Sequence, residues 1–183
     1  MELKISKTTT FSEKVSTLLI CKSVNDLKGF KLNNDEINFI KTSVRNKNRF
    51  ISINQYKRWV FIQLLPEEKK GNELYETLRR EASKLKACLN KHHIKQLTIG
   101  NLGTSERELY AYLEGLVLSH YSFLKYFEKK KEKENKLEVI KIKSKELNQN
   151  HIDELLSICE SVYFARDLVN EPLSFLTAIS TSG

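Results

Sequence analysis

The 183-residue chain has few glycines, prolines or cysteines: 6, 2 and 3 respectively. No C-x-x-C pair is present, and Cys21, Cys88 and Cys159 are far apart within apolar stretches, so we expect buried thiols in a reducing cytosol. No apolar run approaches the roughly 20 residues that span a bilayer, and the N-terminus has no apolar signal-peptide region. We therefore expect a cytoplasmic protein with no membrane partner.

The chain also lacks the common motifs of catalysis and nucleotide binding. It contains no G-x-S-x-G, no P-loop and no G-x-G-x-x-G. Adjacent His92 and His93 point in different directions on a helix, so they cannot chelate one metal ion together. We expect His120 to be a partly buried, hydrogen-bonded histidine. The acidic residues are scattered and fit helix starts. These residues alone indicate an α/β domain without a catalytic constellation.

Two features leave alternatives open. Gly100 and Gly103 lie between an expected strand and an expected helix, where free backbone N–H groups attract anions, but they equally suit a tight turn. The net charge of +8 could indicate a nucleic-acid partner. Half of that charge comes from residues 125–146, with nine Lys and five Glu. Because the signs alternate over 128–135, a solvated connection is the favoured interpretation of that segment.

Strand-like and helix-like residue periods alternate along the chain, which predicts an α/β fold with a mixed, mostly parallel sheet between helical layers. The almost continuous apolar run WVFIQLL favours a strand covered on both faces. Ser105 and Glu108 have capping-box spacing. Gly115, in the middle of a helix, suggests close approach of another backbone. We expect strands at 15–21, 50–53, 59–65, 96–100 and 137–142, with 50–53 and 59–65 forming a hairpin, and helices opening at 34 and covering 72–92, 105–127 and 151–170.

Apolar stripes run along three of these helices. The first is Leu74, Leu78, Ala82, Leu85 and Leu89; the second is Leu109, Leu113, Leu116, Val117 and Phe127; the third is Ile152, Leu155, Leu156, Cys159, Val162 and Tyr163. Pro172 biases Glu171 away from the α region, which predicts that the last helix ends at about Asn170.

The segment ARDLVNEP, Ala165-Arg166-Asp167-Leu168-Val169-Asn170-Glu171-Pro172, resembles the signature of the leucyl aminopeptidase family (cytosol aminopeptidases). The segment EGLVLSHYSFLKY at 114–126 resembles the helix E-G-L-x-L-x-x-Y-x-F-x-x-Y of the same family. After Pro172, Leu173 and Ala178 stand where the family commonly has prolines, while Leu176-Thr177 is kept. Residues 1–95 match the family only in the order of their strands and helices.

The resemblance implies the non-catalytic N-terminal domain of a cytoplasmic, usually hexameric enzyme that releases N-terminal residues from peptides with two divalent metals, Zn²⁺ or Mn²⁺. The metal ligands of that family, several around N-T-D-A-E-G-R, match no residue of this chain, so no catalytic, metal or ligand-binding residue is predicted here. Peptide substrates are expected to bind elsewhere.

The same resemblance implies a macro-domain-like α/β/α domain over 1–150, and over 151–183 an interdomain helix with the start of a linker to a catalytic domain. The predicted domain-junction motif is 165–172. Arg166 and Asp167 would bridge the domains while Asn170 and Glu171 cap and turn the chain; alternatively, Arg166 and Asp167 form a solvent-facing pair. The alternative functions are a basic nucleic-acid-binding module and a nucleotide or ADP-ribose pocket near Gly100–Gly103.

Overall fold

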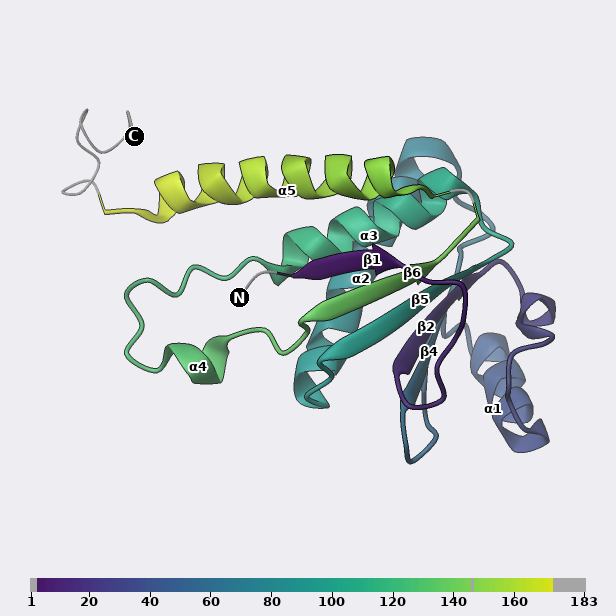
Figure 1. Cartoon of the computed structure of the whole chain (residues 1–183). Coiled ribbons are helices and arrows are strands. Elements are labelled where there is room, and N and C mark those ends of the chain that lie inside the picture. Colours follow the sequence, from purple (N-terminus) through teal and green to yellow (C-terminus); the bar gives the residue numbers. More distant parts are fainter. Residues whose placement is uncertain (1–2, 146, 173–183) are drawn as a thin grey trace.

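The computed structural model describes residues 3–145 and 147–172 (Figure 1). Its sheet has six strands in the order β1-β6-β5-β2-β4-β3, and every neighbouring pair is parallel except β3 and β4. The elements are β1 (Lys4–Lys7), β2 (Ser16–Cys21), the 3₁₀ helix η1 (Val24–Leu27), α1 (Asn34–Arg45), β3 (Phe50–Asn54), β4 (Trp59–Leu64), α2 (Gly71–Lys91), β5 (Gln96–Leu102), α3 (Glu106–His120), α4 (Lys130–Lys133), β6 (Val139–Lys143) and α5 (Gln149–Asn170).

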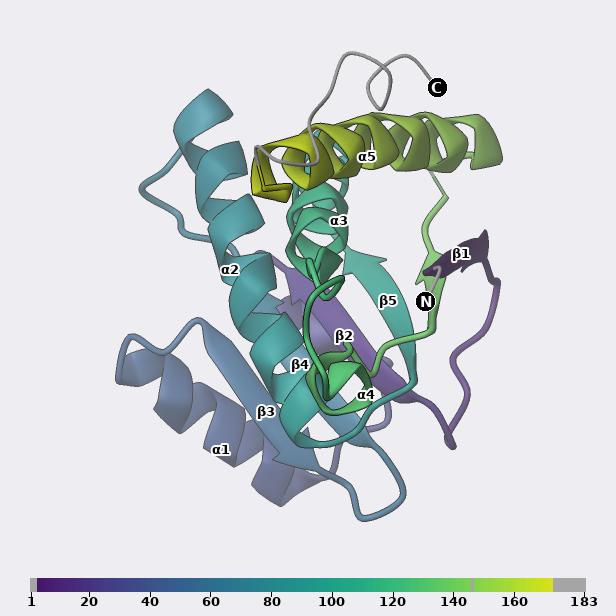
Figure 2. The same cartoon turned by 90° about the vertical axis from the view of Figure 1, so that its left-hand side faces the viewer.

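Helices cover the sheet on both sides, which confirms the predicted α/β/α sandwich. One apolar core lies between the sheet and α2, α3 and α5, and a second, smaller core lies under α1 and η1. Figure 2 shows α2 and α3 side by side along one face, with α5 beyond α3 towards β1. The antiparallel β3–β4 hairpin confirms the predicted turn between 50–53 and 59–65.

The packing of α2 against α3 follows the sequence pattern closely. All five residues of the predicted α2 stripe are buried. A Cβ on Gly115 would overlap the Cα and the carbonyl oxygen of Arg79, so only glycine allows the two backbones to approach this closely. The capping box is present at the start of α3, where Ser105 Oγ accepts from Glu108 N–H at 3.3 Å. The close approach expected at Gly115 is therefore confirmed.

The predicted end of α3 is wrong: the helix ends at His120 and not at residue 127. The Asn135 side chain donates to the His120 carbonyl, which satisfies one of the free carbonyl groups of a helix end. Phe127, expected in the buried stripe, is 43% exposed, and Lys133 Nζ lies 3.7 Å from its ring centroid. Local periodicity continues past residue 120, but the backbone leaves the helical conformation at Tyr121, with φ −55° and ψ 136°.

Strand β1 was not predicted, because its four residues contain a single buried apolar side chain, Ile5. The last helix, α5, begins two residues before its expected start, since Asn148 Oδ1 accepts from His151 N–H at 3.0 Å and caps it. Its end at Asn170 is as predicted. The division into 1–150 and 151–183 stays a prediction. Leu173, Leu176, Thr177 and Ala178 lie outside the described residues. No helix of the described chain is long and apolar enough to cross a bilayer.

Candidate domain-junction site

The second half of α5 lies against the chain that follows α3. Figure 1 shows α5 extending past the ends of β1 and β6, on the side where residues 121–130 also project from the sheet. Arg166 Nη1 donates to the Leu118 carbonyl at 3.0 Å, and its guanidinium carbon lies 5.5 Å from the centroid of the Tyr121 ring. The Tyr163 hydroxyl donates to the Val117 carbonyl. These contacts satisfy carbonyl groups in the last turn of α3.

Tyr121 connects two residues of the predicted motif. Its hydroxyl donates to Asp167 Oδ1 at 2.7 Å and accepts from Asn170 Nδ2 at 3.1 Å. The ring of Tyr121 also lies 5.4 Å from that of Tyr163, centroid to centroid. Burial and the hydrogen bond to Asp167 raise the pKa of Tyr121. The hydroxyl therefore remains a donor at neutral pH.

Glu171 closes the motif at the point where the chain leaves α5. Lys125 Nζ lies 2.6 Å from Glu171 Oε1, and the Tyr126 hydroxyl donates to Oε2. These hydrogen bonds, first from Lys125 and then from Tyr126, hold the pKa of Glu171 below its ordinary value. The φ and ψ of Glu171, −72° and 137°, are extended, as expected for a residue before proline.

The structure thus brings together the two segments that resemble the aminopeptidase family. The polar members of 165–172 bond to residues 118–126, which belong to the other segment. Arg166 and Asp167 both make these contacts, so they are more than a solvent-facing pair. Whether they also contact a second domain stays a prediction. Sequence alone gave no local indication of the Tyr121–Asp167 contact, which joins residues 46 positions apart.

Several apolar residues of α5 from residue 158 onward face outward. Ile158, Phe164 and Val169 are 45%, 60% and 84% exposed. Ile158, Val162, Ala165 and Val169 follow helical spacings of four, three and four, which places them along one flank of the helix. A surface helix usually has the opposite arrangement, with apolar residues inside and polar residues outside. Apolar side chains grouped on a surface are typical of an interaction site.

A polar cavity of about 310 Å³ adjoins these contacts, lined by His120, Tyr121, Ser122, Leu124, Glu134, Asn135, Tyr163 and Asp167. His120 is half-buried as expected; burial, and then the charge of Lys86, lower its pKa to about 4. The imidazole is therefore neutral at pH 7. Of the thiols, Cys21 and Cys159 are buried as predicted and Cys88 is partly buried. Burial raises the pKa of Cys21 to about 12 and that of Cys159 to about 11, so both stay protonated.

The geometry at Gly100–Gly103 favours a tight turn between strand and helix over an anion-binding site. Gly103 has a φ of 76°, and a Cβ on it would lie 3.5 Å from Cγ of Asp26. Asp26 Oδ2 accepts from the backbone N–H groups of Lys22 and Ser23 at 3.0 and 2.8 Å. A carboxylate beside the turn opposes a bound phosphate. A Cβ on Gly100 would overlap the ring of Phe11, so a larger residue at this position would require that ring to shift.

The carboxyl ends of β2 and β4 border a larger cavity of about 410 Å³. After β2 the chain continues to α1 on one face of the sheet, and after β4 it continues to α2 on the opposite face. Open α/β sheets form a crevice where the connections from neighbouring strands go to opposite faces. Its lining has charges of both signs, with Lys22, Lys69 and Lys70 beside Glu67 and Glu108, and Lys22 Nζ lies 4.0 Å from Glu108. These mixed charges select no ligand class.

Among the described residues, no group of three or more His, Cys, Asp or Glu side chains is arranged to hold a metal ion. His92 instead stacks on Trp59, with ring centroids 3.9 Å apart. The Nδ1 of His151 lies 2.7 Å from Glu106 Oε1.

No protein-family model matches the chain, and no curated protein matches its sequence. The structure is similar to that of a point mutant of tomato leucine aminopeptidase, with a TM-score of 0.72 and 14% sequence identity. The match covers 98% of this chain and 40% of the tomato chain. At that identity the similarity shows a shared fold, which extends over nearly all of this chain and about two-fifths of the tomato enzyme.

Proposed function

We propose that the chain is the non-catalytic N-terminal domain of a leucyl aminopeptidase that releases N-terminal amino acids from peptides. The observation that carries the proposal is the fold, shared over 98% of this chain with a leucine aminopeptidase that is more than twice as long. The packing of 165–172 against 118–126 supports it, because these are the two segments that resemble the family.

The proposed task of the domain is docking to the catalytic domain through the distal half of α5, residues 160–170. Hydrogen bonds to residues 117–126 hold this half in place. Exposed Val169 on one flank of the helix and exposed Phe164 on another supply apolar surface for a partner that surrounds this half. The catalytic domain would hold two divalent metals, Zn²⁺ or Mn²⁺, which activate water and polarise the scissile carbonyl. The full enzyme would be a cytoplasmic hexamer.

Hydrolysis of leucine p-nitroanilide tests this function. We expect residues 1–183 to fold and to show no turnover with added Mn²⁺. The proposal also requires a longer natural polypeptide, and we expect that polypeptide to be active. A matched preparation of that polypeptide treated with a chelator should lose its activity. Turnover that follows residues 1–183 through every purification step would overturn the proposal, as would a natural polypeptide without a catalytic domain.

A docking variant separates the role of α5 from that of the fold. Replacing both Phe164 and Val169 by serine should leave residues 1–183 folded, because both side chains are largely exposed. In the longer polypeptide the same double variant should weaken the contact between domains and lower activity or assembly. Ser157 and Ser161, also exposed on α5, offer a control pair for replacement by alanine. Equal effects of the two double variants on activity and assembly would show that Phe164 and Val169 are not part of the docking surface.

A further inference from the structure

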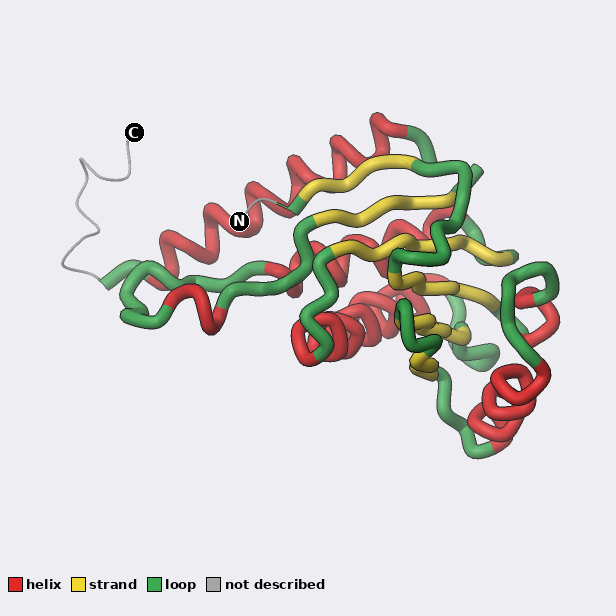
Figure 3. The backbone as a smooth tube through the Cα atoms, turned by 60° about the horizontal axis from the view of Figure 1, so that its bottom comes forward, coloured by secondary structure: helices red, strands yellow, loops and turns green. Residues whose placement is uncertain are grey.

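Part of the sheet is left open on one face. Ile5 of β1 and Ile140 and Ile142 of β6 point into the core that α2, α3 and α5 cover. The alternate residues of the same strands, Lys4, Ser6, Lys141 and Lys143, therefore point to the opposite face. We call these four residues the lysine face. Figure 3 shows β1, β6 and β5 running across the side of the molecule that α2, α3 and α5 do not cover.

The uncovered part of this face lies at the end of the sheet formed by β1 and β6. On the same side, α1 and η1 cover the other end of the sheet, where Leu19, Ile51 and Ile62 are buried. Parallel strands are normally covered on both faces and consist of nearly continuous apolar residues. The sequences KISK and VIKIK instead alternate apolar and polar residues, so these two parallel strands are built to leave one face in water.

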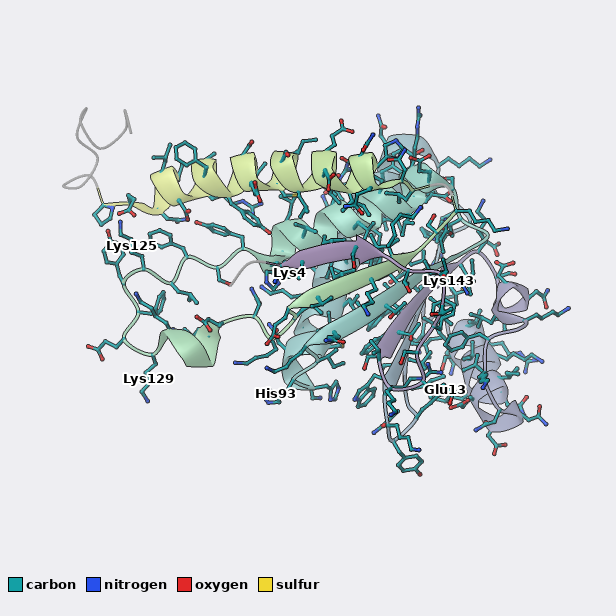
Figure 4. The ribbon with its side chains drawn as sticks, in the orientation of Figure 1. Lys4, Glu13, His93, Lys125, Lys129 and Lys143 are labelled. Carbon is teal, nitrogen blue, oxygen red and sulfur yellow. The ribbon has the colours of Figure 1, made fainter. Side chains whose placement is uncertain are left out.

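The described part of this face carries uncompensated positive charge. Lys4 and Lys141 are exposed and form no ion pair with a described residue, and Lys143 Nζ lies 4.3 Å from the centroid of the Phe11 ring. The nearby Glu138 is already paired, with Lys95 Nζ 2.9 Å from its Oε1. Figure 4 shows Lys4 and Lys143 towards opposite ends of the β1–β6 pair. The face is separate from the mixed-charge run at 128–135.

The geometry points to a binding surface for the phosphate backbone of a single nucleic-acid strand. Lys141 and Lys143 lie on the same face of β6, about 6.6 Å apart along the strand, which lets the two ammonium groups contact two different phosphates of one chain. Neighbouring strands lie about 4.8 Å apart, so a face two strands wide fits one phosphate chain better than a duplex. Lysine contacts only phosphate here, so binding is independent of base sequence.

A protein partner fits the lysine face less well. Stable protein interfaces have an apolar centre and are depleted in lysine. The apolar side chains on this side are the half-buried Val139 and Phe11. Exposed apolar side chains lie elsewhere on the molecule, among them Phe164 and Val169 on α5. The two surfaces therefore suit different partners.

Counterion release sets the expected size of the effect. Three lysines that each neutralise one phosphate of a single strand give a slope of about −2 in log affinity against log salt. Raising the salt from about 50 to about 200 mM should then weaken binding about 20-fold. A surface that binds by apolar contact would show little change over the same range.

Fluorescence anisotropy with a labelled single-stranded oligonucleotide of mixed sequence tests the inference. We expect the full chain to bind at low salt and the double variant Lys141→Glu, Lys143→Glu to bind at least about tenfold more weakly, with a shallower salt slope. The matched control is Lys28→Glu, Lys41→Glu, which makes the same change in net charge at exposed positions beside η1 and on α1. The control should lose less than about threefold.

Three results would overturn the inference: no binding by the full chain at low salt, equal losses in the two double variants, or capture of polyglutamate with no binding of the oligonucleotide. The last would identify an acidic protein segment as the partner. Circular dichroism checks that each variant folds. If the Lys141, Lys143 variant does not fold, Lys4→Glu replaces it, since Lys4 is exposed on an edge strand, and an unchanged affinity in that variant also overturns the inference.

Discussion

The two halves of α5 are held to the rest of the molecule by different forces. The proximal half, residues 149–159, buries Ile152, Leu155 and Cys159 completely in the main core. The distal half, 160–170, buries no side chain fully and is held by hydrogen bonds to 117–126. Burial of a leucine-sized side chain contributes about 1.5–3 kcal/mol, against about 0.5–1.5 kcal/mol for a hydrogen bond. The proximal half therefore contributes to the stability of the fold, whereas the distal half is held in place by hydrogen bonds but remains exposed to solvent.

The largest expected effect is in the proximal half. Leu155→Ala should lower the free energy of unfolding by about 2–5 kcal/mol, because it removes a fully buried side chain and leaves a cavity. Urea unfolding followed by circular dichroism measures this. Leu156→Ala, at a half-buried neighbour, is the control and should cost clearly less. Equal costs at the two positions would show that the proximal half is not anchored by its buried stripe.

Removal of one hydroxyl should loosen the distal half and leave the core intact. Tyr121→Phe deletes the group that bonds to Asp167 and Asn170, at a cost of about 1 kcal/mol. Hydrogen exchange should become faster at amides 163–170 and remain unchanged at α2 and β5. Uniformly faster exchange would mean that Tyr121 contributes to global stability and not to the position of α5.

Acid should release the end of the distal half. The hydrogen bonds from Lys125 and Tyr126 depress the pKa of Glu171 below its ordinary value of 4.5. Their contribution is therefore complete above about pH 4.5 and is lost as the pH falls through the depressed value. The NMR amide shift of residue 171 should move clearly more over this range in the natural chain than in Glu171→Gln. Identical titrations in the two proteins would exclude this carboxylate as the cause.

The smallest expected effect is at the exposed apolar residues. Val169→Ser should change the free energy of unfolding of residues 1–183 by no more than about 0.5 kcal/mol, because the side chain is 84% exposed. Chemical denaturation measures this directly. A loss of unfolding free energy comparable to that of Leu155→Ala would show that Val169 stabilises the fold of this chain and is not a free contact residue for a partner.

The sequence predicted what local patterns determine. The α2 stripe and the capping box at Ser105 depend on residues near one another in the chain, and both were found. A glycine in the middle of a helix also predicted the close approach at Gly115, but its partner, Arg79, lies too far along the chain for the sequence to identify. The end of α3 depends on Asn135, which lies 15 residues beyond His120, so periodicity could not locate it. Strand β1 is stable only because β6 pairs with it.

The α5 stripe shows the same limit within one helix. Its apolar period continues from Ile152 to Tyr163, but full burial ends at Cys159, and Tyr163 is only partly buried against the core. Sequence could not distinguish apolar residues that meet the core from those that meet solvent. The junction contacts were also beyond local reasoning, since Tyr121 meets Asp167 only through the packing of α5 on α3.

Oxidative footprinting of Phe164 tests most directly whether the distal half of α5 is a docking surface. The side chain is 60% exposed in this chain, and Tyr56, 99% exposed at the β3–β4 turn, provides an internal reference. We predict that Phe164 is labelled readily in residues 1–183 and at least about tenfold more slowly, relative to Tyr56, in the longer polypeptide that the proposed function requires, as expected when a partner covers it. Labelling of Phe164 at the same relative rate in both would contradict the account.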